Sequence, residues 1–258
     1  MAEATLDDRS LWSTDTFLAP PGSLDGRALV LTGAEGHHAA DVARVRAGDL
    51  VRLIDGEGVE ALGRVQEAGR GTVAIEISDA RCHHRGEGIE LVVFQAILKG
   101  RRFEEVVRKC CELGVSEIVP VTTERTIARG SAAATKLARW RDIARASVKQ
   151  SRGVFLATIA EPVSLARVVG RVRGGLPTLV AWEEEVSVSL ADVLRETPTE
   201  RPMGLVVGPE GGMSPAEVGV LIEAGGRAFG IGRRILRADW AAAAIAAMIS
   251  GERKGLLP

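Results

Sequence analysis

The chain has 258 residues, of which 46% are hydrophobic and 26% charged, and its formal net charge is −1. This composition is typical of a globular protein with one large or two modest domains, and it excludes a disordered or fibrous chain. No apolar run reaches the length of a membrane span, and the N-terminus lacks the basic start and apolar core of a secretory signal.

Turn signals divide the N-terminal third of the chain into short β-strands. Apolar segments cover residues 28–31, 50–54, 59–65 and 73–77, and a short helix is expected over residues 37–46. Together with a loose N-terminal arm, these segments predict a small barrel-like domain over residues 1–80. Exposed arginines on such a domain either contact phosphate or are simply solvated, and the candidates are Arg44, Arg46 and Arg52.

Strands and helices alternate over residues 86–258. The near-continuous apolar run at residues 89–97 is typical of a strand in a buried parallel sheet. The alternation predicts a second, α/β domain. Its further strands are expected at residues 117–121, 178–182, 205–207 and 228–231, and its helices at residues 103–113, 135–150, 163–172, 189–195, 215–224 and 241–248.

The segment 125–152 is strongly basic in a chain that is slightly acidic overall. It holds eight arginines and lysines against a single acidic residue, Asp142. A charged helix face is usually just solvated, but an excess this one-sided favours binding to phosphate.

Two glycine-containing loops near the C-terminus each follow an apolar strand and precede a helix. The first is GPEGG at residues 208–212, and the second begins at Gly232. After the first loop, Ser214 is the expected N-cap of a helix that has Pro215 at its first position and Glu217 three residues after the cap. Each loop read alone is an ordinary turn. Two of them at the carboxyl edge of a parallel sheet indicate a ligand site.

The three cysteines give no sign of a disulfide framework. Cys110 and Cys111 are neighbours in an expected helix, so their side chains point apart. The segment Cys82-His83-His84 lacks a second ligand cluster at metal-binding spacing. We therefore expect free thiols, no bound metal and a cytoplasmic location.

The C-terminal motifs resemble those of the trefoil-knotted SPOUT methyltransferases. The shared features are GPEGG followed by Ser-Pro-x-Glu, then IG-x-x-IL-R and a helix of small residues. Within that superfamily the chain is similar to the bacterial family that methylates N3 of a uridine in 16S ribosomal RNA. His38, Val45, Arg46, Gly48 and Asp49 match the PUA-like N-terminal domain of the same family. The resemblance implies an α/β fold with a C-terminal knot, beside a PUA-like β-barrel.

The resemblance also implies that three loops bind S-adenosylmethionine in a bent shape. The third of these loops follows the strand that ends at Trp182. Gly211→Val is then expected to abolish donor binding, because the backbone must approach the ligand closely. The residues implied in cofactor binding are Val180, Ala181, Trp182, Gly208, Pro209, Glu210, Gly211, Gly212, Ile231, Gly232, Ile235, Leu236, Arg237 and Ala238.

Two residues of these loops are candidates for a catalytic role. Arg237 either stabilises the negative charge that develops on the uracil carbonyls or holds an RNA phosphate. Glu210 either accepts the N3 proton, directly or through water, or orients its loop. RNA contacts are expected from Arg44, Arg46, Lys99, Arg101, Arg125, Arg139, Arg145 and Arg152.

The sequence departs from the family pattern just before its last helix. Ala238, Asp239 and Trp240 stand where a threonine-containing triplet is common, and Arg233 stands in place of a common proline. These departures motivate an alternative function, a knotted RNA-binding protein with lost or altered methyltransferase activity. A second rival, a non-knotted nucleotide-binding enzyme, lacks its usual G-x-G-x-x-G or P-loop motif.

The expected partners are 16S ribosomal RNA or the small ribosomal subunit, and a second copy of the chain. The helix at residues 241–248 (AAAAIAAM) presents small side chains that let another helix come close. We expect it to take part in a two-fold dimer interface, as the resemblance implies.

Overall fold

The computed structural model describes residues 14–84, 90–126, 136–198, 202–232 and 235–254. The chain divides into two compact units. The first, called the β unit here, comprises Met1–Glu87 and Val148–Leu156, and the second, the α/β unit, comprises Gly88–Ser147 and Ala157–Pro258. Residues 148–156, which the sequence analysis places in the second domain, therefore belong to the first unit by their contacts. The domain bounds of 1–80 and 86–258 remain a prediction.

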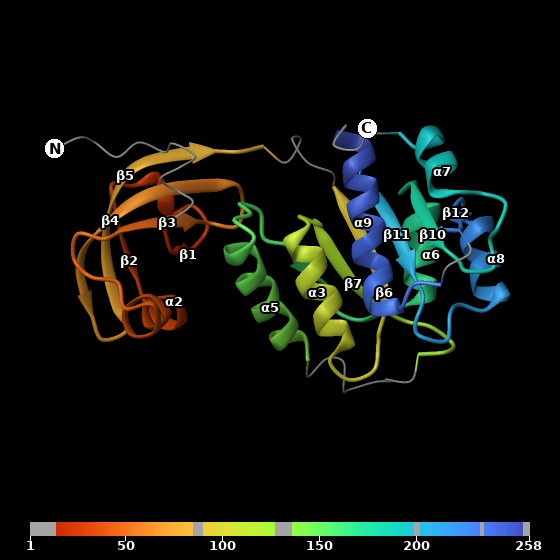
Figure 1. The fold of residues 1–258 in the computed structure, drawn as a ribbon, viewed down its shortest axis with the longest axis horizontal. Helices are drawn as coiled ribbons and strands as arrows, with labels where there is room; N and C mark the ends of the chain where they lie inside the picture. Colours follow the sequence, from red (N-terminus) through yellow and green to blue (C-terminus); the bar gives the residue numbers. More distant parts are fainter. Residues whose placement is uncertain (1–13, 85–89, 127–135, 199–201, 233–234, 255–258) are drawn as a thin grey trace. The chain divides into compact units, whose positions relative to one another are not determined.

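The β unit is built on a five-stranded sheet with the order β1-β3-β4-β5-β2 (Figure 1). β1 runs parallel to β3, and the other neighbours are antiparallel. The strands follow the predicted apolar segments, except that β1 was not predicted. The elements are β1 (Thr16–Leu18), the 3₁₀ helix η1 (Ser23–Asp25), β2 (Ala28–Leu31), α2 (Gly33–His37), the π-helix η2 (His38–Ala43), β3 (Leu50–Ile54), β4 (Val59–Gly69) and β5 (Thr72–Cys82).

A buried ion pair crosses the β3–β4 hairpin of this unit. Arg52 donates from Nε and Nη2 to Glu60 Oε2 at 2.9 and 2.7 Å, and both residues are at most 5% exposed. His83 Nε2 lies 2.6 Å from the other carboxylate oxygen of Glu60. Burial raises the pKa of Glu60, but the hydrogen bonds from Arg52 and His83 outweigh it and hold the pKa below its usual range. The suggestion that Arg52 contacts phosphate is therefore wrong, because its charge is engaged inside the unit.

Arg52→Met is expected to reduce the free energy of unfolding of the β unit by about 3 kcal/mol at neutral pH, because it leaves Glu60 as a buried charge without its main partner. The pKa of Glu60 is lowered by folding, so the stability it contributes is present above the unfolded-state pKa and is lost as pH falls. The difference between parent and variant should therefore shrink on acidification. Urea unfolding followed by circular dichroism measures it. Arg46→Met, at an exposed position, is the control, and an equal loss in both variants would contradict the assignment.

The α/β unit contains a seven-stranded sheet with the order β12-β10-β11-β6-β7-β8, in which β9 also pairs with β7. Every pairing in it is parallel. The strands are β6 (Leu91–Ala96), β7 (Glu117–Thr122), β8 (Thr158–Ile159), β9 (Val163–Ser164), β10 (Thr178–Ala181), β11 (Met203–Val207) and β12 (Arg227–Phe229). The helices are α3 (Arg102–Glu112), α5 (Leu137–Gln150), α6 (Leu165–Arg173), α7 (Leu190–Glu196), α8 (Pro215–Glu223) and α9 (Ala238–Lys254).

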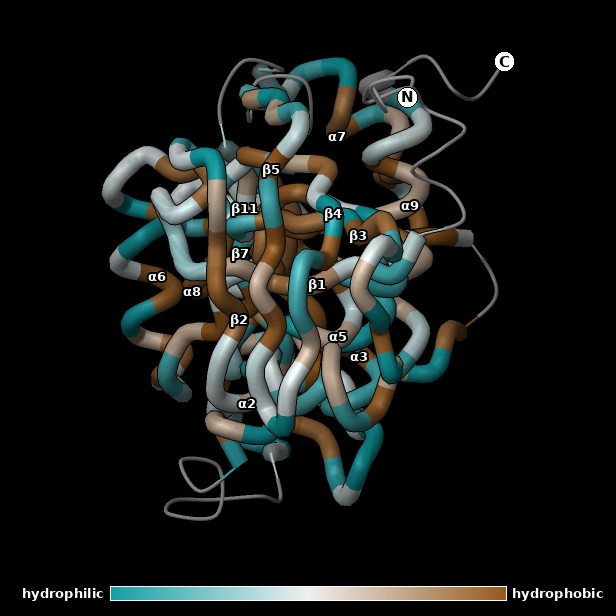
Figure 2. Tube along the Cα trace, turned by 90° about the vertical axis from the view of Figure 1, so that its left-hand side faces the viewer, coloured by the Kyte–Doolittle hydropathy of each residue, from teal (hydrophilic) through white to brown (hydrophobic). Residues whose placement is uncertain are grey.

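Two groups of helices cover the sheet. α9 contacts α3, β6 and β11, whereas α6 contacts α8 and β7 (Figure 1). Val206 of β11 packs with Val168 of α6 and Leu221 of α8. Since side chains alternate along a strand, Leu205 and Val207 point to the other face, toward α9. All six residues of β6 are buried. Figure 2 shows hydrophobic segments, in brown, around the neighbouring strands of the sheet near β11 and β7.

Local sequence signals explain where several helices begin. Ser214 accepts a hydrogen bond from Glu217 N, and Glu217 accepts one from Ser214 N, so the expected capping box before α8 is confirmed. The helix expected at residues 163–172 begins only at Leu165, because Val163 and Ser164 pair with β7. None of the helices in the part of the chain that the structure describes has the length and hydropathy to span a bilayer.

Candidate functional site

Three neighbouring strands end in one row at the carboxyl edge of the parallel sheet. In the register of β10, β11 and β12, Ala181 lies beside both Val207 and Phe229. The chain leaves these strands at residues 182–189, 208–214 and 230–232. Parallel strands that end together bring their following loops together, so the three loops meet at one place.

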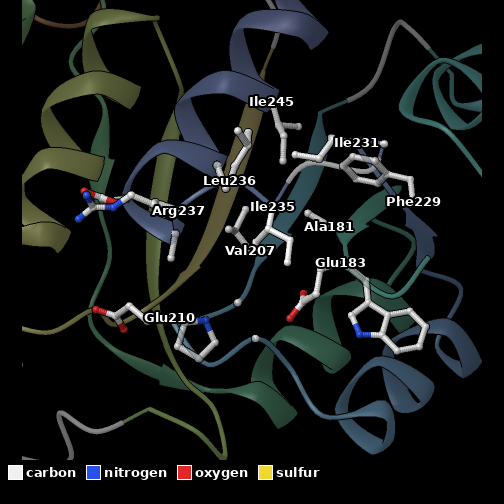
Figure 3. A pocket seen from close by; sticks show the side chains of 18 of the residues that line it. Ala181, Glu183, Val207, Glu210, Phe229, Ile231, Ile235, Leu236, Arg237 and Ile245 are labelled. Carbon is white, nitrogen blue, oxygen red and sulfur yellow. The ribbon is translucent and has the colours of Figure 1, made fainter. Parts of the chain in front are cut away.

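A cavity of about 780 Å³ lies at this edge, within the range of small-molecule sites. In Figure 3, Phe229, Ile231 and Ile245 lie on one side of it, and Glu183 and Glu210 lie on the opposite side. The cavity thus has an apolar wall, suited to an aromatic ring, and a charged wall. It is lined by Arg102, Ala181, Trp182, Glu183, Val186, Val207, Gly208, Pro209, Glu210, Gly212, Phe229, Ile231, Gly232, Ile235, Leu236, Arg237, Ala238, Asp239, Ala241 and Ile245.

The structure brings most of the sequence-predicted cofactor residues to this cavity. Two of them do not line it. Val180 is 0% exposed and packs in the core between the sheet and helices α6 and α8. Gly211 faces outward, and a Cβ built on it would meet the aliphatic chain of Arg125 at 3.6 Å. The residues that do line it are Ala181, Trp182, Gly208, Pro209, Glu210, Gly212, Ile231, Gly232, Ile235, Leu236, Arg237 and Ala238.

Sequence reasoning missed several lining residues, among them Arg102, Glu183, Phe229 and Ile245. Glu183 directly follows Trp182, the residue at which the strand before the third loop is expected to end. Arg102 belongs to the run Lys99-Gly100-Arg101-Arg102 after β6, of which only two residues were singled out. Ile245 lies in the helix for which only a role in assembly was expected.

The Glu210 carboxylate holds its loop in place. Its Oε1 accepts hydrogen bonds from Lys99 N at 3.1 Å and from Arg102 Nη1 at 3.2 Å. These contacts join the loop after β11 to the loop after β6. Of the two roles open for Glu210, the geometry favours orientation of the loop.

Gly212 is the glycine that the site most requires. Its φ of +69° lies in the left-handed region, which β-branched side chains rarely adopt. A Cβ at this position would also overlap Oε1 of Glu183. The backbone conformation therefore favours glycine, and its absent side chain leaves room for the Glu183 carboxylate in its present position.

Comparison with known proteins gives the family of the chain. Residues 86–250 match the family model described as an RNA methyltransferase domain, and residues 31–78 match the RNA methyltransferase PUA domain. The chain belongs to this RNA methyltransferase family. These matches, with the structural ones below, confirm the expected fold class of a SPOUT α/β unit beside a small PUA-like β unit.

Members of the family with curated names are similar over most of the chain. The "Ribosomal RNA small subunit methyltransferase E" of Mycobacterium bovis is 34% identical over 233 residues, which is 84% of this chain and 84% of that protein. The protein of the same name from Bacillus subtilis is 28% identical over 82% of this chain and 85% of its own length.

Solved structures of the family share the fold. The ribosomal RNA small subunit methyltransferase E of Neisseria gonorrhoeae, bound to S-adenosylmethionine, has a TM-score of 0.81 and 28% identity and covers 91% of this chain and 96% of its own. A methyltransferase from Legionella pneumophila, in complex with the same cofactor, has a TM-score of 0.82 and 26% identity and covers 93% and 98%.

Of the residues that depart from the family pattern, Arg233 lies outside the described residues, and the triplet at residues 238–240 does not fill the cavity. Ala238 and Asp239 line it at the start of α9, whereas Trp240 is 55% exposed, with Lys109 Nζ 4.3 Å from the centre of its ring. Arg237 is 70% exposed in its side chain, and its Nε lies 3.4 Å from Asp239 Oδ1. The cavity thus stays open despite the bulky Trp240.

The candidate RNA-binding residues of the α/β unit differ in how far their charges are already paired within the protein. Arg139 forms two hydrogen bonds with Glu104, at 2.8 and 2.9 Å, and these bonds lower the pKa of Glu104. Arg145 pairs with Asp142 on the exposed face of α5, where such pairs are weak. Arg125 donates to Gly211 O at 2.7 Å, while Lys99 and Arg101 are exposed beside the cavity residue Arg102.

The candidates of the β unit lie outside its regular strands. Arg44 and Arg46 are exposed, and Arg44 ends the π-helix in the left-handed conformation, with a φ of 59°. Arg152 is partly buried and has a φ of 60°. In the described ranges, no group of three or more His, Cys, Asp and Glu side chains is placed to hold a metal ion.

Proposed function

We propose that this protein methylates N3 of a uridine in the 16S ribosomal RNA of the small subunit, with S-adenosylmethionine as the methyl donor. The observation that carries the proposal is the cavity at the ends of β10, β11 and β12. The named relatives support the substrate, and the cofactor-bound structures from Neisseria gonorrhoeae and Legionella pneumophila support the donor.

The residues of the cavity fit this donor. The wall formed by Phe229, Ile231 and Ile245 is suited to the adenine ring, and the glycine loops let backbone N–H and C=O groups approach closely. The charged wall suits the zwitterionic amino-acid end of the donor.

The donor supplies both the activated methyl group and its leaving group, so positioning is the main task of the protein. We assign Arg237 to the uracil carbonyls, where a cation stabilises the negative charge left as N3 loses its proton. Its exposure of 70% leaves it accessible to a substrate as large as RNA. Glu210 is assigned to loop orientation, since Lys99 N and Arg102 already occupy one of its carboxylate oxygens.

Methylation of purified small subunits and of their naked RNA tests the proposal. The protein should bind S-adenosylmethionine in a calorimetric titration, and mass spectrometry should find 3-methyluridine at one position of the treated RNA. Donor binding with no methyl transfer to either substrate, or with transfer to another atom, would contradict the assigned reaction. A protein that binds RNA but no donor would support the alternative of a binding-only member of the family.

We also propose a homodimer formed through α9. On the solvent side of this helix, Trp240, Ala244, Ala247 and Met248 follow the spacing of one helix face, and all are at least partly exposed. Such an apolar stripe, without charges, suits close packing against a second helix. Ile235, 82% exposed at the cavity, lies a few residues before the same helix.

For RNA, we propose contacts from both units. Lys99, Arg101 and Arg125 lie beside the cavity loops, and Arg145 lies on the outer face of α5. The charge of Arg139 is largely balanced by Glu104, to which it forms two hydrogen bonds, so we expect a smaller contribution from it. We assign Arg44, Arg46 and Arg152 of the β unit to phosphate contacts, which position a protein without reading sequence.

A further inference from the structure

The charged wall of the cavity contains one carboxylate that the rest of the site leaves unused. Glu210 accepts from Lys99 N and Arg102, and Asp239 lies beside Arg237. Among the described residues, no hydrogen bond or ion pair reaches the Glu183 carboxylate, which lines the cavity and is exposed to solvent. Figure 3 shows this carboxylate pointing into the cavity, away from Phe229 and Ile245.

Gly212 leaves room for the Glu183 carboxylate in the cavity. Any Cβ at residue 212 would overlap Oε1 of Glu183, so the left-handed glycine and the carboxylate share one space. A carboxylate set against the backbone of a ligand loop, without a partner of its own, loses hydration when a ligand closes the cavity. The ligand must then bring a cation or hydrogen-bond donors to that point.

We propose that Glu183 binds the α-ammonium group of the donor's amino-acid end. This inference rests on the proposed function, because it takes the cavity to be the donor site. The adenine ring fits the apolar wall, and Glu183 lies on the opposite wall, where the amino-acid end is then placed. The contact is a charge-assisted hydrogen bond, of the kind that ammonium and carboxylate groups form.

The other cation of the donor, its sulfonium, is a poorer partner for Glu183. The charge on sulfur disappears during methyl transfer, so a carboxylate against it would stabilise the ground state more than the transition state and slow the reaction. The ammonium keeps its charge throughout. A carboxylate that binds it strengthens donor binding without raising the barrier.

Three ligands that differ in these groups separate the roles in calorimetric titrations of the full chain. S-adenosylmethionine carries both cations, S-adenosylhomocysteine carries only the ammonium, and 5′-methylthioadenosine carries neither. Glu183→Gln should lower the affinity for the first two ligands by the same factor, about 10- to 100-fold, and leave the affinity for the third unchanged. Glu184→Gln, which alters the exposed neighbouring carboxylate outside the cavity, should leave all three affinities unchanged.

Each other outcome overturns the assignment in a distinct way. A loss of affinity for S-adenosylmethionine alone would place Glu183 at the sulfonium. A loss of affinity for all three ligands would place it at the ribose or adenine. Unchanged affinities in Glu183→Gln would remove it from the donor site. If the parent protein bound none of the three, the proposed function itself would fail, which the parent titration reveals before any variant is made.

Discussion

Gly212→Val is expected to abolish measurable binding of S-adenosylmethionine while the protein stays folded. Valine is β-branched and strained at a φ of +69°, at a cost of about 1–3 kcal/mol in the local backbone. Its Cβ would also overlap Glu183 Oε1, so the carboxylate or the loop must leave its position. Both belong to the cavity lining, so the strained loop and the displaced carboxylate together change the shape of the site. Calorimetry measures the affinity, and circular dichroism reports the fold.

Gly211→Ala is the matched control one residue away. Its φ is outside the left-handed region, and an added Cβ would make ordinary contacts with Arg125 at 3.6 and 3.7 Å. The variant should bind the donor within a few-fold of the parent. The sequence motif predicts Gly211 as the sensitive position; because Gly211 does not line the cavity, we expect Gly212 to be the more sensitive of the two. A folded Gly212→Val protein with the affinity of the parent would place the donor elsewhere.

Ala244→Glu is expected to convert a dimeric parent into a folded monomer. Ala244 lies between Trp240 and Met248 on the exposed stripe of α9, so a glutamate there would bury a charge in the proposed interface. Desolvating an unpaired carboxylate costs several kcal/mol, which is a large part of a micromolar association. Light scattering at micromolar concentration should give twice the chain mass of 27.3 kDa for the parent and the single mass for the variant.

Ala191→Glu provides the comparison for this test. Ala191 is exposed on a different helix, α7, and is not part of the stripe, so the same substitution there should leave the dimer intact. Dissociation of both variants would indicate a general effect of added charge. A parent protein that scatters as a 27.3 kDa particle would refute the dimer itself.

Much of the fold follows from local sequence. β3 at Leu50–Ile54 matches the predicted segment residue for residue, because its apolar run is bounded by turn signals. The capping box at Ser214 was readable because all its members lie within four residues. β1, by contrast, has only three residues and is held by pairing with β3, more than 30 positions along the chain. No local sequence pattern therefore indicates it.

The candidate site divides in the same way. The glycine loops were evident because the motif is contiguous, and most of its residues line the cavity. Glu183 and Arg102 were missed because their importance depends on which loops meet, a matter of sheet order. Arg52 was expected to be exposed, but it is buried against Glu60 on the next strand of the hairpin. This pairing, too, depends on how the strands come together and not on the local sequence.

With the donor in the cavity and RNA at Lys99 and Arg101, as proposed above, the Glu210 link between two loops would make the two ligand sites thermodynamically dependent on each other. Its carboxylate is held by Lys99 N and Arg102, in the segment that also presents Lys99 and Arg101 to solvent. A phosphate that draws Arg102 away removes one of the donors that fix the loop after β11. Coupling free energy is reciprocal, so a cofactor that favours one position of this loop alters the affinity for RNA by the same factor that RNA alters the affinity for the cofactor. The family's two substrates would then be sensed through a single carboxylate.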